Sequence, residues 1–384
     1  MPVIRTVCGD IRPEELGCTS VHEHTIMSAK VMGDILEKSM PLMMEGIKSY
    51  RGGADLGEEM ARRMKEQLPP VPQRDIQGVI KSLRLPEDHP GNKLSGIDYY
   101  TKELETFRQV GGQSLCDCST RPNDTPFSQV RELSQKSGVH ILVCAGFYTK
   151  PSMPQDVLDG NEIYIRGLVE NQIANGDGSC DARPGFVKCA VSLVERGKIS
   201  AAELNNVRAC AKTAKAHGMS LHIHTGFPVR KEHISQLAEE LKSKIGIDPD
   251  KVIFCHMDDH SIGFNPSAHI NEDGYDIELP LSLIKSGFNV GLDTWSISMA
   301  EKEVANYAIR ARKGLLKELI VKGGADHIVL GHDMNSRASG VQNNGCGYTM
   351  WPTVLKEMVD QGELDPDDYQ RMTVLNPSRI LTIG

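Results

Sequence analysis

The feature that most constrains the fold is a regular alternation of short apolar segments with longer amphipathic ones. Eight segments have the length and residue types of buried parallel strands, and the runs between them have apolar residues at helical spacing. A strand followed by a helix, repeated eight times, is the pattern of a (β/α)8 barrel, or TIM barrel. The predicted strands are Cys18–His24, Ser114–Ser119, His140–Gly146, Gly185–Ala190, Ser220–His224, Val252–His256, Phe288–Asp293 and Ile328–Asp333.

A doubly wound parallel sheet is the main alternative α/β fold with this alternation. It predicts a glycine-rich phosphate loop directly after the first strand. Here the first predicted strand ends in His22-Glu23-His24 instead, which favours the barrel. The helices predicted between the strands include Phe127–Ser137, Asn161–Ala174, Ala201–His217, Glu232–Lys244, Ala300–Lys322 and Trp351–Gln361.

The length of 384 residues suits one barrel domain, because barrels of this class tolerate long insertions. We predict a single domain over residues 1–384 with an inserted loop region at about 28–94, and a second long connection at 259–278. Both follow strands, so both belong to the barrel face where active sites lie. Long loops of this kind are usually functional; decoration or a subunit contact is the alternative. We expect a homodimer or a higher homo-oligomer.

Composition excludes several classes of function. The net charge is −8 and the basic residues are scattered, so we expect no nucleic-acid partner. No apolar run approaches the ~20 residues of a membrane span, and the start of the chain lacks the apolar core of a signal peptide. The ten cysteines show no paired spacing, which is typical of reduced thiols. These features predict a cytoplasmic protein that acts on a small-molecule substrate.

His22 and His24 stand one residue apart in the first predicted strand. Successive side chains of a strand alternate between faces, so the two imidazoles share a face and Glu23 takes the other. Two such imidazoles can hold one metal ion, although the pair alone is equally consistent with two ordinary histidines. Whether a metal site exists therefore depends on the residues at the ends of the other strands.

Four further strands have a polar residue where a ligand is needed. The fourth contains Lys188 among apolar residues, and lysine is almost never fully buried without a partner. The fifth, sixth and eighth strands end in His224, His256 and Asp333. His222 lies two residues deeper than His224, so we predict that it is structural.

This set exceeds what one ion with an open coordination position needs, and it is enough for two. Two ions about 3.5–4 Å apart need a bridging anion. A lysine amine that has added carbon dioxide is a carbamate with two oxygens for that purpose; the alternative is an unmodified Lys188 in an ion pair with Asp333. We predict two divalent ions, zinc first and manganese, cobalt or iron as alternatives, held by His22, His24, Lys188, His224, His256 and Asp333.

Motifs across nearly the whole chain resemble those of the phosphotriesterase family of the amidohydrolase superfamily. Residues 28–94 and 259–278 are not well covered by the resemblance. The motifs are Val21-His22-Glu23-His24, Cys116-Asp117-Cys118-Ser119-Thr120, Ala145-Gly146-Phe147-Tyr148, Arg183-Pro184-Gly185-Phe186-Val187-Lys188, His224-Thr225, His256-Met257-Asp258-Asp259, Gly331-His332-Asp333 and Thr373-Val374-Leu375-Asn376-Pro377-Ser378-Arg379.

The resemblance implies a hydrolase with two metal ions on a distorted barrel. A hydroxide that bridges the ions would attack the substrate, the outer ion would polarise the substrate oxygen, and Asp333 would accept the proton as the catalytic residue. By the same resemblance the inner ion is held by His22, His24 and Asp333, the outer ion by His224 and His256, and both by the carbamate of Lys188.

Tyr148 bears on the choice of substrate. Organophosphate hydrolases of this family often have tryptophan at this position, whereas the lactone-hydrolysing branch often has tyrosine. The resemblance therefore implies a lactone or another carboxyl ester or amide as substrate. The alternatives are an organophosphate triester hydrolase and a non-catalytic ligand-binding homologue. Of the cations expected near the barrel mouth, Arg337 is the predicted contact for an anionic substrate tail, ahead of Lys150, Arg230 and Lys231.

Overall fold

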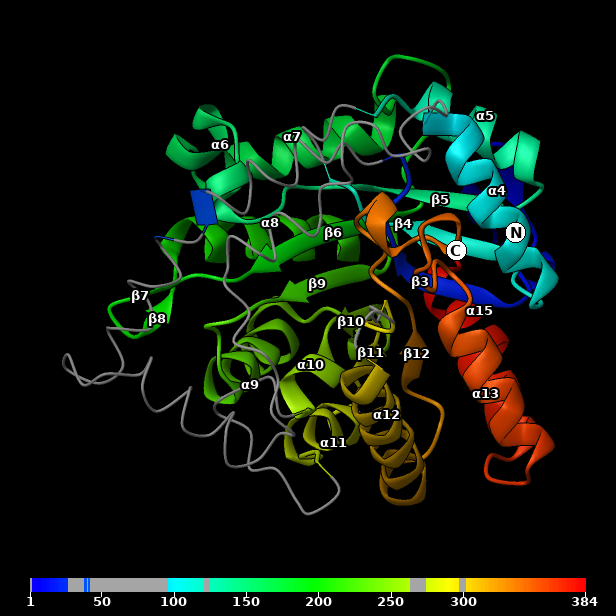
Figure 1. The fold of residues 1–384 in the computed structure, drawn as a ribbon. Coiled ribbons are helices and arrows are strands. Elements are labelled where there is room, and N and C mark those ends of the chain that lie inside the picture. The colour runs from blue at the N-terminus through cyan, green and yellow to red at the C-terminus, as the bar shows by residue number, and fades with distance from the viewer. Residues whose placement is uncertain are drawn as a thin grey trace.

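A computed structural model describes residues 2–26, 38–39, 41, 96–120, 125–262, 274–296 and 302–384. Eight parallel strands lie side by side in the order β12-β11-β10-β9-β6-β5-β4-β3, with helices outside them (Figure 1). Each strand falls within a predicted segment or within one residue of it, and the predicted (β/α)8 barrel is confirmed. The strands are β3 (Thr19–Glu23), β4 (Ser114–Asp117), β5 (His140–Ala145), β6 (Phe186–Val191), β9 (Leu221–Thr225), β10 (Val252–Phe254), β11 (Asn289–Leu292) and β12 (Ile328–Leu330).

The outer layer is made of helices that connect successive strands. Helix α5 ends at Gly138 and α8 ends at Gly218, and both glycines are left-handed, with φ of 68° and 62°. The predicted helix at 232–244 continues through a π-helical turn at Glu240–Ile245. The helices are α4 (Gly96–Gln109), α5 (Phe127–Ser137), α6 (Gln155–Asp159), α7 (Glu162–Asn175), α8 (Ala201–His217), α9 (Lys231–Glu239), α10 (Met257–Ser261), α11 (Glu278–Lys285), α12 (Lys302–Gly323), α13 (Met350–Asp360), α14 (Pro366–Gln370) and α15 (Asn376–Leu381).

Two small hairpins accompany the barrel. The first, β1 (Ile4–Thr6) with β2 (Gly9–Ile11), precedes β3. The second, β7 (Val194–Glu195) with β8 (Lys198–Ile199), follows β6. The two ends of the chain meet at a bridge between Val3 and Ile383.

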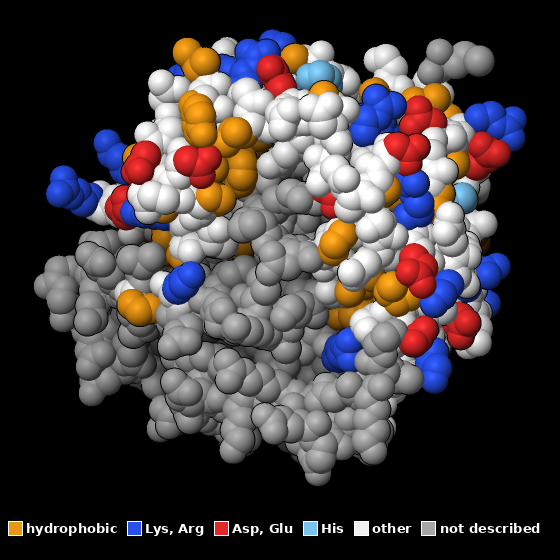
Figure 2. Space-filling view, turned by 90° about the horizontal axis from the view of Figure 1, so that it is seen from above, with side chains coloured by type: hydrophobic (Ala, Val, Ile, Leu, Met, Phe, Trp, Pro, Cys, Tyr) orange, Lys and Arg blue, Asp and Glu red, His pale blue; other side chains and the backbone are white. Residues whose placement is uncertain are grey.

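The predicted insertion at 28–94 lies almost wholly outside the described residues, and so does the middle of the connection at 259–278. The two ends of that second connection are described, and Ile262 pairs with Tyr275 there. All ten cysteines are free thiols. In the described part of the chain, no helix combines the length and apolar character that crossing a membrane requires. Acidic and basic side chains are interspersed over the described part of the face seen from above (Figure 2).

A buried seam between β3 and β12 closes the barrel. Gly331 follows β12, and a Cβ at this position would lie 2.9 Å from the carbonyl oxygen of His22, so only glycine permits this approach. Across the seam Glu23, which is fully buried, accepts hydrogen bonds from the backbone N–H of His332 (2.9 Å), its Nδ1 (2.7 Å) and the Met334 N–H (3.2 Å). The first and last strands are thus joined largely by one carboxylate.

Replacing Glu23 by alanine should therefore destabilise the fold. The change leaves the donors of His332 and Met334 buried without an acceptor, and we expect a loss of about 3 kcal/mol in the free energy of unfolding. Urea denaturation measures it. The control is Glu15→Ala, because Glu15 is exposed and its carboxylate bonds to Arg12, through the guanidinium and the backbone N–H, so its loss is expected to change stability much less. Equal effects of the two substitutions would contradict the role of Glu23 at the seam.

Candidate active site

Five of the six predicted ligands lie at or just beyond the carboxyl ends of four barrel strands, and the sixth, Lys188, lies midway along β6. His22 is in β3, Lys188 in β6 and His224 in β9. The others, His24, His256 and Asp333, follow β3, β10 and β12. Parallel strands point their carboxyl ends to one face of a barrel, so residues far apart in the sequence meet there.

The first cluster contains His22, His24 and Asp333. One donor atom from each lies within 4.8 Å of the other two. The Asp333 Oδ1 is 3.1 Å from His24 Nε2 and 3.7 Å from His22 Nε2. Two imidazole nitrogens and a carboxylate oxygen that converge in this way match the ligand preferences of zinc and similar divalent ions.

The second cluster is formed by His224 and His256. Their Nδ1 and Nε2 atoms face each other at 2.7 Å, with the ring centroids 4.5 Å apart. The Tyr148 hydroxyl lies 3.2 Å from His224 Nδ1. A second group of imidazole donors therefore stands on the strands that follow Lys188.

The strand register explains why a long side chain is needed on β6. Lys188 is level with His222 on β9, whereas Ala190 is level with His224. A two-residue step is about 6.6 Å. The four-carbon stem of lysine spans this step, and Lys188 Nζ lies 3.2 Å from His22 Nε2. The His222 ring stays in the lower layer, where it packs on Phe186 and its Nε2 lies 3.3 Å from Ser220 Oγ.

Lys188 is fully buried and has unusual neighbours. Apart from His22, its amine contacts the Cys255 thiol at 3.4 Å, and none of the described carboxylates lies within 4.0 Å of it. The ion pair between an unmodified Lys188 and Asp333 is therefore absent here. Burial lowers the pKa of this amine, but the Cys118 and Cys255 thiols and Asp293 outweigh burial and raise it, so an unmodified Lys188 is charged. A buried ammonium without a carboxylate within 4.0 Å is costly, so this setting fits a modified amine.

Asp293, at the end of β11, orients ligands of both clusters. Its fully buried carboxylate accepts from His22 Nδ1 at 2.8 Å and from the backbone N–H of His256 at 2.7 Å, and it lies 3.2 Å from His256 Nδ1. These bonds leave the Nε2 atoms of both rings for other partners. Metal-binding histidines usually have such a carboxylate behind them.

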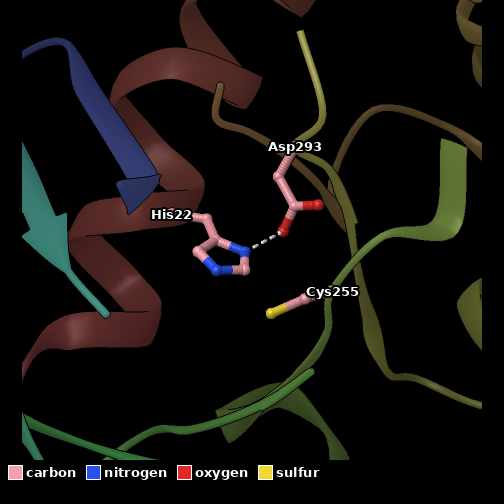
Figure 3. Close-up of side chains that lie close together, drawn as sticks. All are labelled: His22, Cys255 and Asp293. Carbon is pink, nitrogen blue, oxygen red and sulfur yellow. Dashed lines mark hydrogen bonds and ion pairs between the residues drawn. The ribbon is translucent and has the colours of Figure 1, made fainter. Parts of the chain in front are cut away.

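Figure 3 shows Asp293 and Cys255 beside the His22 ring, a second grouping of three potential ligands. Burial raises the pKa of the Cys255 thiol well above its usual range, so the sulfur stays protonated. A neutral thiol is a poor metal ligand, and Asp293 is already bonded to His22 Nδ1. This grouping therefore serves as support behind the His22, His24 and Asp333 cluster.

Two predicted ligands adopt the left-handed backbone conformation. His256 has φ of 64° and Asp333 has φ of 53°. Residues other than glycine adopt this region uncommonly, and such strain is concentrated at functional sites. Hydrogen bonds hold both residues in place: the Asp333 N–H donates to the His22 carbonyl at 3.0 Å, and Asp293 accepts from the His256 N–H.

The protonation of the site favours cation binding. Burial, with Lys188 nearby, lowers the pKa of His22 to about 4, and burial with His256 nearby also lowers the pKa of His224. Burial opposes ionisation of Asp333, yet the imidazoles around it hold its pKa well below the usual range. His256 differs, because Asp293 outweighs the effect of burial and raises its pKa to about 9. At neutral pH the site thus offers neutral imidazoles at His22 and His224 and an ionised carboxylate at Asp333, whereas His256 has to lose its proton before it can hold a cation.

A cavity of about 210 Å³ opens onto this site. A larger groove along α12 contains none of the predicted ligands. Arg337 does not line the cavity; its guanidinium stands 5.0 Å above the Tyr99 ring. Lys150 and Lys231 are paired with Glu195 and Glu278. The described residues that line the cavity are His224, Thr225, Gly226, Phe227, His256, Asp259, His260 and Asp333.

The sequence reasoning assigned no role to Asp293 and Ser119, although both lie at the ends of predicted strands. Ser119 supports His24, with its Oγ 2.8 Å from His24 Nδ1. The role of Asp293 could have been recognised from the sequence, because it is a carboxylate at the end of the seventh predicted strand, as the other candidate ligands are at the ends of theirs.

This chain belongs to the phosphotriesterase family, which matches it over residues 2–381, and it is a hydrolase. It is 23% identical over 393 residues to an N-acetyltaurine hydrolase of Dictyostelium discoideum, which covers 99% of this chain and 98% of the relative. The human N-acetyltaurine hydrolase is 22% identical over 387 residues, with 99% and 97% covered. A phosphotriesterase-related protein of Nematostella vectensis is 21% identical over 392 residues, with 98% of each chain covered.

Solved structures share the fold over nearly the whole chain. A resiniferatoxin-binding protein from Rhodobacter sphaeroides has a TM-score of 0.67 at 22% identity, covering 99% of this chain and 94% of that one. The phosphotriesterase homology protein of Escherichia coli, solved with phosphate in its active site, has a TM-score of 0.65 at 18% identity, with 96% and 99% covered. Both support the barrel architecture.

Substitution of the two histidines of β9 should have different consequences. His224→Ala should lower the metal content and abolish turnover, because it removes a donor from the cluster. His222→Ala should retain the metal and cost one to a few kcal/mol of stability, on the order of a lost core side chain. Metal analysis and thermal unfolding of both variants measure this. Metal loss in His222→Ala with retention in His224→Ala would show that the assignment is reversed.

Asp293→Asn should weaken metal binding without removing a donor from either cluster. The amide keeps the shape of the carboxylate but no longer supports the rings of His22 and His256 with a charge, so we expect the affinity to fall about 10–100-fold. Competition with a chromophoric chelator measures the affinity. Ser119→Ala, which removes only a neutral hydrogen bond to His24, should cause a smaller loss. An unchanged affinity in Asp293→Asn would contradict the orienting role.

Proposed function

We propose that this chain is a metal-dependent hydrolase that cleaves the carboxyl amide or ester bond of a small molecule. The observation that carries the proposal is the convergence of four imidazoles, one carboxylate and one buried amine on a single face of the barrel. The donor types fit divalent ions, and zinc is the first choice. Metal-assisted hydrolysis is the chemistry that such a set supports.

The donors divide naturally between two ions. His22, His24 and Asp333 would hold one, and His224 and His256 the other. Lys188 reaches toward the first cluster from the strand beside His224, and as a carbamate it would supply the bridging oxygens. Its burial without a carboxylate partner supports this assignment, because a carbamate would leave no unpaired ammonium in the site. The two ions, when bound, supply Lewis-acid activation of water and of the scissile carbonyl.

The protein's own groups have distinct tasks in this proposal. Asp333 lines the cavity and is held ionised, so it can accept a proton released during hydrolysis. Tyr148 has the opposite character: burial raises the pKa of its hydroxyl, which therefore stays protonated and can donate a hydrogen bond to the substrate oxygen. Both groups lie beside the second cluster or the cavity, where a reacting carbonyl would sit.

The names of the relatives favour an amide over a phosphate ester. Several are N-acetyltaurine hydrolases, which are named for an N-acyl amide with an anionic tail. The cavity of about 210 Å³ suits a small acyl group. We therefore place N-acyl amides of small anionic amines first and lactones second, since Tyr148 supports carboxyl substrates in general. Arg337 remains the proposed contact for an anionic tail, although the described structure places it on Tyr99.

The test combines metal analysis with a substrate panel. After purification with excess zinc or manganese, elemental analysis should give two ions per chain. The panel contains N-acetyltaurine, N-acetyl amino acids, γ-lactones and a paraoxon-like phosphotriester. We expect kcat/KM to be highest for one of the carboxyl compounds, by about 100-fold over the phosphotriester, a difference of about 2.7 kcal/mol in barrier height.

Lys188→Ala is the control for a contaminating esterase and should lose nearly all turnover. Activity that survives this substitution, or a content of one ion or none, would refute the two-ion proposal. A preference for the phosphotriester would assign the site to organophosphates instead.

A further inference from the structure

The loop that carries Tyr148 follows β5 and is held by helix α8. The Tyr148 ring meets the His224 ring edge to face at a centroid distance of 4.9 Å. This ring contact and the hydroxyl contact with His224 also depend on the loop backbone, because an unrestrained loop residue has several backbone conformations. The groups that restrain the loop backbone therefore decide where the hydroxyl stands.

Glu203, in the first turn of α8, provides the main restraint. Its carboxylate is fully buried and accepts four hydrogen bonds. One oxygen, Oε1, accepts from the Lys150 N–H at 3.1 Å and from the Ser192 hydroxyl at 3.2 Å. The other, Oε2, accepts from the N–H groups of Ser192 and Leu193, both at 2.9 Å. One side chain thus ties the loop after β5 to the loop after β6, the strand of Lys188.

Asn206, one turn further along α8, holds the other side of the loop. This residue is also fully buried, and its Nδ2 donates to the Phe147 carbonyl at 2.8 Å. Phe147 precedes Tyr148 and Lys150 follows it by two residues, so the tyrosine is bracketed by bonds from one helix. Outside the buried pair, Lys150 Nζ reaches Glu195 of the β7–β8 hairpin at 2.5 Å.

Burying the Glu203 carboxylate costs free energy. Burial raises the pKa of Glu203 to about 7, although the hydrogen bonds from Ser192, Lys150 and Leu193 oppose that rise. A buried carboxylate that served only to fill space would be replaced more cheaply by an apolar residue. All four hydrogen bonds that Glu203 accepts come from groups of the two loops, so the carboxylate acts on the position of these loops.

We propose that Glu203 and Asn206 are positioning residues that clamp the Tyr148 loop to the loop after β6 and so hold the Tyr148 hydroxyl beside His224. The clamp sets how well this hydroxyl is aligned for a substrate oxygen. The catalytic part of this inference rests on the proposed function, whereas the restraint on the loop does not.

The sharpest variant is Glu203→Gln. Its amide oxygen can keep the bonds from the Ser192 and Leu193 N–H groups, and its NH2 group can donate to the Ser192 hydroxyl. The NH2 group then faces the Lys150 N–H, donor against donor, so the lost bond is the one to the Tyr148 loop. Asn206→Leu removes the bond to Phe147 on the other side and serves as a second variant should Glu203→Gln fold poorly.

Thr213→Val is the matched control. Thr213 is also a fully buried residue of α8, but its hydroxyl bonds only to the Ala209 carbonyl of its own helix, at 2.9 Å. Hydrogen–deuterium exchange of the metal-loaded protein should be faster at residues 147–150 in Glu203→Gln and Asn206→Leu, and unchanged there in Thr213→Val. Unchanged exchange in both clamp variants would overturn the proposal.

Kinetics then separates positioning from stability. On the best substrate of the panel, Glu203→Gln and Tyr148→Phe should each lower kcat/KM about tenfold, and the double variant should lose no more than the worse single variant. Losses that multiply would show that Glu203 acts independently of Tyr148 and would overturn the positioning role.

The two arms can also fail separately. If the protein without substitutions turns over no substrate of the panel, the proposed function fails. The exchange experiment still decides whether the clamp exists.

Discussion

The structure depends on one buried carboxylate at the seam where the barrel closes. Glu23 stands between the two histidines of the first strand and points away from them, into the gap between β3 and β12. By accepting from His332 and Met334 it fixes the segment that contains Asp333. The strand segment that contains His22 and His24 therefore also holds Asp333 within reach of them. Closure of the barrel and assembly of the first cluster thus depend on the same contacts.

Behind the ligands lies a second layer that makes their burial tolerable. Imidazoles buried in a barrel lose solvation, which is why the pKa values of His22 and His224 fall. Asp293 and Ser119 form hydrogen bonds with the Nδ1 atoms of His22 and His24 and leave their Nε2 atoms facing Asp333. The left-handed backbone of His256 and Asp333 is strain of the kind that a packed scaffold can maintain at a functional site.

The register between β6 and β9 explains why the ligand on β6 is a lysine. Lys188 is level with His222, one layer of inward-facing side chains below His224. Only a long side chain reaches the upper layer from there. On the other side of β6, α8 holds the loops that follow β5 and β6. The barrel thus presents the proposed ligands from its strands and Tyr148 from a loop restrained by a helix.

The sequence by itself determined the barrel and the types of ligand. Strand periodicity and burial are local properties, so all eight strands could be predicted. A histidine, lysine or aspartate in a barrel strand could likewise be recognised from the sequence as a potential metal ligand. Tertiary structure alone decided the supporting contacts. Asp293 meets His22 across 271 positions, and Glu203 meets the Lys150 amide across 53. The contact between Arg337 and the Tyr99 ring, 238 positions apart in the sequence, is of the same kind. Such pairings depend on strand register and helix placement, which no local pattern encodes, because a hydrogen bond forms only when two distant backbones bring its donor and acceptor within about 3 Å.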